Sequence, residues 1–131
     1  MIPTMAAQRY KTVQVQTCSP GDLLVLLYQG LHRFLTEAAM AMRAKDRGRA
    51  GEKIDKAYGI LCELLTGLRR EEAPELCDRL QGLYIFCMGH LVEANIQQDA
   101  DKIDEVARIL TPVREAFTQA VRMTEGKPQA P

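Results

Sequence analysis

The sequence lacks tryptophan and is poor in aromatic residues, which make up only 5% of its 131 residues. This scarcity disfavours a nucleic-acid module that stacks bases on aromatic rings. An excess of charge of either sign is also absent, because 17 basic residues balance 17 acidic ones. The sequence therefore predicts no attraction to nucleic acid or to an anionic membrane.

Long apolar runs are missing too. The six apolar or aromatic residues 23–28 fall far short of the roughly 20 that a membrane-spanning helix needs. The first sixteen residues contain no apolar segment typical of a signal peptide. We therefore expect a single cytoplasmic domain without membrane insertion.

Groups for catalysis or metal binding are few. The four cysteines form no Cys-x-x-Cys pair, and they are Cys18, Cys62, Cys77 and Cys87. His90 precedes Glu93 by three residues, which reverses the Glu-x-x-His order of di-iron bundles. This His-x-x-Glu spacing also occurs only once in the sequence, whereas a di-iron site needs the motif on two helices. No neighbouring base is evident for Cys18, and no glycine-rich phosphate loop is present. The sequence predicts neither an enzyme nor a cofactor or metal site.

Apolar residues recur at spacings of three and four along most of the chain, which predicts four helices at about 20–44, 50–68, 75–97 and 101–122. Ser19 and Pro20 are typical of a helix start, and Asp99 or Asp101 is expected to cap the last helix. Pro112 lies inside that helix and predicts a kink or break there.

Four long helices with short connections predict an all-α, antiparallel up-down four-helix bundle over residues 19–124. Residues 1–18 lack helical periodicity, but Val13 and Val15 alternate with glutamines and follow Tyr10. We expect an extended N-terminal arm that docks on another surface. Residues 125–131 are expected to form a frayed tail.

The helices carry more apolar residues than one core-facing stripe requires. The additional residues are Leu23, Val25, Leu26, Ile60, Leu64, Ile85, Phe86, Val92 and Ile96. A wider core or a homodimer face would use them, and so would an apolar groove that binds a partner helix. Because three of the four helices share the excess, partner binding is the favoured interpretation.

Four segments follow one another along the chain, and they are YKTVQV, SPGDLLVLLYQGLHRFLTEA, KIDKAYGILCELLTGL and LYIFCMGHLVEANIQQDADKIDEVARIL. In this order they resemble the flagellin-export chaperone family of the FliS type. The resemblance covers about residues 10–117. It implies a helical bundle without catalysis or cofactor that binds the disordered C-terminal segment of flagellin, prevents its premature polymerisation and holds it for the flagellar export apparatus.

The resemblance, together with the apolar excess, predicts which side chains contact the cargo. They are Leu23, Leu27, Tyr28, Ile60, Leu64, Tyr84, Leu91 and Asn95. Asn95 either bonds the backbone of an extended cargo stretch or bonds within its own helical turn. By the same resemblance, the arm bearing Tyr10, Val13 and Val15 is expected to cover the groove until cargo arrives.

Two further partners follow as expectations: the flagellar export gate, and a second copy in a homodimer. The main alternative to the chaperone is a self-associating helical structural or adaptor protein with no flagellin cargo.

Overall fold

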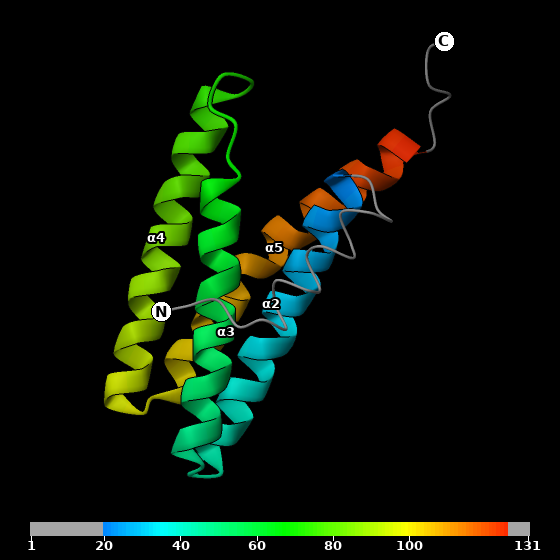
Figure 1. Cartoon of the computed structure of the whole chain (residues 1–131). Coiled ribbons are helices and arrows are strands. Elements are labelled where there is room, and N and C mark those ends of the chain that lie inside the picture. The colour runs from blue at the N-terminus through cyan, green and yellow to red at the C-terminus, as the bar shows by residue number, and fades with distance from the viewer. Residues whose placement is uncertain (1–19, 126–131) are drawn as a thin grey trace.

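A computed structural model describes residues 20–125, which form four helices and no strand within that range. The helices are α2 (Pro20–Arg43), α3 (Arg47–Thr66), α4 (Pro74–Gln97) and α5 (Ala100–Glu125), shown in Figure 1. Each end of each helix lies within one helical turn of the position that the sequence predicted. The all-α bundle is confirmed, while the arm, Ser19 and the tail lie outside the described residues.

The helices pack in a ring. Helix α2 contacts α3 and α5, and α4 contacts the same two helices, so α2 and α4 lie diagonally across the bundle. Figure 1 shows α2 and α5 diverging from α3 and α4 toward the end where residues 67–73 connect α3 to α4. At the opposite end, the connections from α2 to α3 and from α4 to α5 are short.

These two short connections use the same local geometry. Lys45 and Gln98 adopt left-handed backbone conformations, with φ of 62° and 53°. In each case the next residue donates its N–H to the carbonyl five residues earlier, at 2.9 Å and 3.0 Å. That next residue, Asp46 or Asp99, then caps the following helix by accepting a backbone N–H at 3.1 Å or 3.0 Å. The predicted cap at the start of the last helix is therefore confirmed at Asp99.

Helix α5 continues through Pro112 without the break that the sequence allowed. The proline ring lies on the exposed side of the helix, away from the core. Beside it, the Thr111 hydroxyl donates to the carbonyl of Ala107 at 2.7 Å. Pro112 has no N–H to donate to the carbonyl of Arg108. Both residues are exposed, so water can hydrogen-bond to that carbonyl instead.

The core contains two buried tyrosines from diagonal helices. Tyr28 of α2 and Tyr84 of α4 are each 1% exposed, and their hydroxyls are hydrogen-bonded to each other. Burial raises the pKa of both hydroxyls above the usual tyrosine value. The Tyr28 ring also stacks on Phe117 of α5, with the ring centroids 5.6 Å apart. One polar pair in an otherwise apolar core therefore links three helices.

Replacing one of these tyrosines leaves the other hydroxyl buried without its partner. We expect Tyr84→Phe to lower the free energy of unfolding by about 1–3 kcal/mol. The Tyr28→Phe/Tyr84→Phe double variant should cost less than the sum of the single variants, because no unpaired hydroxyl remains. Urea unfolding followed by circular dichroism measures both, with Tyr58→Phe on the half-buried side of α3 as the control. Additive losses would show that the hydroxyls act independently.

Candidate functional site

The eight predicted contact residues fall into two groups. Four of them are at most 5% exposed and belong to the core, and they are Tyr28, Leu64, Tyr84 and Leu91. Their side chains face the centre of the bundle, so they can contact a partner only if the helices separate. The direct contact with cargo that was expected of these four therefore does not fit this structure. In it they are core residues that pack beneath the exposed side chains of the helices.

The other apolar members lie together on α2 and α3. Leu23 and Leu27 are one turn apart on α2, and Ile60 lies on the neighbouring helix α3; all three are half-buried. Gly30 lies one turn further along α2, where a Cβ atom would meet the Ile60 Cδ1 at 3.5 Å. We call Leu23, Leu27, Gly30, Phe34 and Ile60 the α2–α3 face.

Phe34 continues this face and is surrounded by cations. The guanidinium of Arg33 and the ammonium groups of Lys53 and Lys56 lie 5.1, 5.6 and 5.5 Å from its ring centroid. The Lys53 ammonium also lies 2.9 Å from Glu37, and this hydrogen bond lowers the pKa of the Glu37 carboxyl. The apolar face therefore has a charged border, in which Lys53 pairs with Glu37 and Lys56 pairs with Glu52 at 3.3 Å. The spacing of residues in the sequence does not predict this cluster of charges, because Arg33 lies on α2 whereas Lys53 and Lys56 lie on α3.

Asn95 lies apart from the α2–α3 face. It is exposed near the end of α4, and the Gln98 side-chain amide donates to its carbonyl at 2.7 Å and reaches its Oδ1 at 3.4 Å. The structure thus shows a bond within its own turn. Its predicted contact with cargo is untested.

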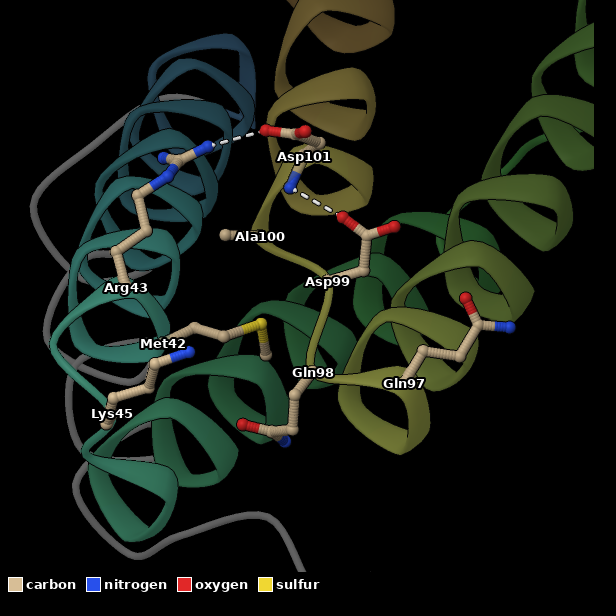
Figure 2. Close-up of a pocket in the computed structure, with 8 residues that line it drawn as sticks. All are labelled: Met42, Arg43, Lys45, Gln97, Gln98, Asp99, Ala100 and Asp101. Carbon is tan, nitrogen blue, oxygen red and sulfur yellow. Dashed lines mark hydrogen bonds and ion pairs between the residues drawn. The ribbon is translucent and has the colours of Figure 1, made fainter.

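An open polar pocket of about 440 Å³ occupies the end of the bundle near Gln98. Figure 2 shows Met42, Arg43 and Lys45 on one side and the connection from α4 to α5 on the other. Arg43 lies 2.9 Å from Asp101 and 2.6 Å from Asp104, and these carboxylates raise its pKa. These charges already pair with one another, and the ion pairs from Arg43 join α2 to α5 beside the pocket.

His90 has a structural contact of its own. Its Nε2 lies 2.7 Å from a carboxylate oxygen of Glu105, and its ring stacks on Phe86 with centroids 5.3 Å apart. Glu93 instead pairs with Lys102 at 3.0 Å, which lowers the pKa of its carboxyl. Within residues 20–125, no three His, Cys, Asp or Glu side chains gather as metal ligands.

The thiols described by the structure also lack an activating environment. Cys77 and Cys87 are buried, and burial raises the pKa of the Cys87 thiol to about 11. Cys62 is half-buried, and Cys18 lies outside the described residues. Such cysteines behave as small apolar residues.

Four residues of the predicted apolar excess are exposed, and all four lie on α4. Ile85, Phe86, Val92 and Ile96 are 51%, 53%, 45% and 77% exposed. Leu64, by contrast, lies in the core, and the additional residues of α2 are half-buried. None of the four described helices is long and apolar enough to cross a membrane.

Exposed apolar surface on a helical bundle is typical of proteins that bind other proteins. Comparison with known proteins identifies the family of this chain. Residues 3–124 match the family described as flagellar protein FliS, and the chain belongs to this family. The family is one of chaperones, so the protein is not an enzyme, as the sequence predicts.

Three relatives illustrate the match. The flagellar secretion chaperone FliS of Bacillus subtilis is 34% identical over 113 residues, covering 86% of this chain and 84% of the relative. FliS of Salmonella typhimurium is 32% identical and covers 80% and 78%. FliSB of Pseudomonas aeruginosa is 34% identical and covers 89% and 96%. The resemblance to flagellar export chaperones is thereby confirmed.

Gly30 allows a test of how closely α2 and α3 approach. We expect Gly30→Ala to raise the free energy of unfolding by about 0.5–1 kcal/mol, because glycine is unfavourable inside a helix and a Cβ here makes only ordinary contact with Ile60. Gly59→Ala, in the open middle of α3, should give a similar gain and serves as the matched control. A loss at Gly30 with a gain at Gly59 would show closer packing than the structure has.

Proposed function

We propose that this protein is a cytoplasmic flagellar secretion chaperone that binds the disordered C-terminal segment of flagellin. Binding prevents premature polymerisation and keeps the segment ready for export. The observation that carries this proposal is the match, over more than three quarters of both chains, to relatives named as flagellar secretion chaperones.

The α2–α3 face supports the proposal physically. A disordered segment loses conformational entropy when it folds on a surface, and an extended apolar contact offsets that loss. Leu23, Leu27 and Ile60 already lie partly in contact with solvent, so a cargo helix can bury them further without opening the core. The cations around Phe34 favour cargo whose helix carries acidic residues beside its apolar stripe.

In this proposal Leu23, Leu27, Ile60 and Asn95 contact cargo directly. Tyr28, Leu64, Tyr84 and Leu91 hold the helices at the spacing that the surface requires. Asn95 lies at the other end of the bundle, so cargo that reaches it together with Leu23 must run along the length of the molecule.

A charge placed on the α2–α3 face should prevent cargo from docking. We expect Ile60→Asp to weaken binding of a C-terminal flagellin peptide at least tenfold, because an ionised carboxylate loses its hydration against apolar cargo. Isothermal titration calorimetry measures the affinity. Met40→Asp, which alters an exposed apolar residue of α2 away from this face, is the control and should bind as the unmodified chain does.

Circular dichroism of Ile60→Asp separates lost docking from lost folding. If the unmodified, folded chain shows no binding at tens of micromolar peptide, the cargo assignment is overturned. Equal binding by the Ile60→Asp variant would move the contact to another face.

We also propose that the N-terminal arm competes with cargo through Tyr10, Val13 and Val15. Deleting residues 1–16 should then tighten peptide binding several-fold, because no competitor has to leave. Replacing Tyr10, Val13 and Val15 by serine in the full-length chain tests the same contact without shortening it. Unchanged or weaker affinity in both variants would contradict competition by the arm.

The flagellar export gate remains a proposed second partner of the loaded chaperone. The alternative function, a self-associating structural or adaptor protein without flagellin cargo, makes a different prediction in sedimentation. Its oligomer would form at all accessible concentrations and would ignore the peptide, whereas the proposed chaperone forms a stable complex with it.

A further inference from the structure

Three cations meet at Phe34, but the chain supplies carboxylate partners for only two of them. The charged groups of Arg33, Lys53 and Lys56 lie 5.1, 5.6 and 5.5 Å from the Phe34 ring centroid. Each lysine forms an ion pair with a carboxylate of the chain. Arg33 is exposed, and no carboxylate of residues 20–125 forms an ion pair with it. The cations on Phe34 therefore lack one matching negative charge.

The two lysines differ in how firmly their partners hold them. The Lys53 side chain is only 13% exposed, and its ammonium joins α3 to Glu37 of α2 at 2.9 Å. Lys56 pairs with Glu52, one turn away on the same helix, and the Glu52 side chain is 60% exposed. Exposed pairs of this kind contribute little stability. Arg33 and Lys56 are thus the two cations that a partner can engage, and they come from different helices.

Both of these cations adjoin the α2–α3 face. Gly30 and Phe34 are one turn apart on α2, and Lys56 and Ile60 are one turn apart on α3. A Cβ atom at Gly30 would meet the Ile60 Cδ1 at 3.5 Å, so the two helices are close here. At about 1.5 Å per residue, Lys56 lies about 6 Å along the helix from Ile60. One turn of a helical cargo segment spans the same distance.

We propose that Arg33 and Lys56 together bind one carboxylate of the cargo, three or four residues from an apolar cargo residue that packs on Ile60. The carboxylate belongs either to an acidic side chain or to the C-terminus of the cargo, because both present the same two oxygens. That flagellin supplies it rests on the function proposed above, whereas the carboxylate and its spacing follow from the charges and the geometry of this face.

The residue types suit a carboxylate. A guanidinium can donate two parallel N–H···O bonds to one carboxylate, and such charge-assisted pairs are stronger than neutral hydrogen bonds. Contact with the Phe34 ring restricts Arg33 before cargo arrives, so less conformational entropy is lost on binding. One unpaired cation also matches a carboxylate better than a phosphate, which carries more than one negative charge. The site therefore selects cargo by charge as well as by apolar contact.

A pair of small probes tests the site without any cargo. Isocaproate carries a carboxylate on an apolar chain, and isocaproamide is its uncharged amide. In NMR titrations of the isotope-labelled full chain, isocaproate should shift the backbone signals of Arg33 and Phe34 with a Kd at least threefold lower than that of the amide. Arg33→Gln should abolish this preference. Arg79→Gln is the matched control and should retain it, since Arg79 is exposed on α4 and has no ion pair within residues 20–125.

Three results of these titrations would each overturn the proposal. They are equal affinity for the two probes, no saturable shift at Arg33 and Phe34, and a preference for isocaproate that survives in Arg33→Gln. Lys56→Gln provides a second variant on the other helix and should also reduce the preference. Circular dichroism should show both variants folded, because Arg33 has no ion pair to lose and Lys56 loses only an exposed one.

Neutralised peptides identify the source of the carboxylate. In the C-terminal flagellin peptide each Asp or Glu is replaced in turn by Asn or Gln, and a further peptide carries a C-terminal amide. One of these peptides should bind the unmodified chain at least fivefold more weakly than the original peptide does. Arg33→Gln should weaken binding of the original peptide by a similar factor, and the two losses should not add when combined. Losses that add in full, or no loss with any peptide, overturn the proposal.

The same measurements separate the carboxylate site from the function proposed above. If the flagellin peptide does not bind the unmodified chain while isocaproate shows the expected preference, only the cargo assignment fails. If the peptide binds, and neither the small probes nor the neutralised peptides depend on Arg33, only the carboxylate site fails.

Discussion

The hydrogen bond between the hydroxyls of Tyr28 and Tyr84 constrains the rest of the bundle. Both hydroxyls are buried among apolar side chains, so each must find its partner in the protein. The two residues belong to diagonal helices that pack mainly through their neighbours. The bond therefore fixes how far α2 and α4 are shifted along each other, a shift that apolar contacts alone specify weakly. Helices α3 and α5 pack between these two and contact both of them.

Much of this arrangement could be predicted from the sequence, since a helix's spacing of apolar residues and its caps are local properties. The four helices, the cap at Asp99 and the exposed apolar residues of α4 are examples. The orientation of each helix about its own axis is not local. Tyr28 and Leu64 were expected at the surface, and the approach of neighbouring helices buried them instead.

Other features also depend on two elements at once. The cations around Phe34 come from α2 and α3, and the contact between His90 and Glu105 joins α4 to α5. Pro112 shows the reverse case, in which a strong local signal for a break does not end the helix and its ring lies on the exposed side. The sequence therefore predicted that apolar side chains would remain at the surface of the bundle, and it could not predict which of the expected contact residues would be buried; their contact with cargo stays a prediction.

The apolar surface also differs between two parts of the bundle. The α2–α3 face is half-buried and bordered by cations, whereas α4 exposes Ile85, Phe86 and Val92 and carries no Asp, Glu, Lys or Arg from Leu80 to Val92. A protein that must hold a partner and later release it benefits from apolar side chains that are already partly buried in the unbound state. Releasing the partner then returns less apolar area to water. The exposed apolar side chains of α4 present more of their area to water and so gain more from being covered.

The two tight connections at one end of the bundle have a mechanical consequence. The left-handed turns at Lys45 and Gln98 lie there, together with the ion pairs from Arg43 to Asp101 and Asp104. The chain is thus clamped at this end, and any opening of the bundle turns about it as about a hinge. The largest displacement then falls at the far end, where α2 begins at Pro20 and carries Leu23 in its first turn. A small rotation of the helices at this end would therefore produce a large change in the exposure of the α2–α3 face at the start of α2.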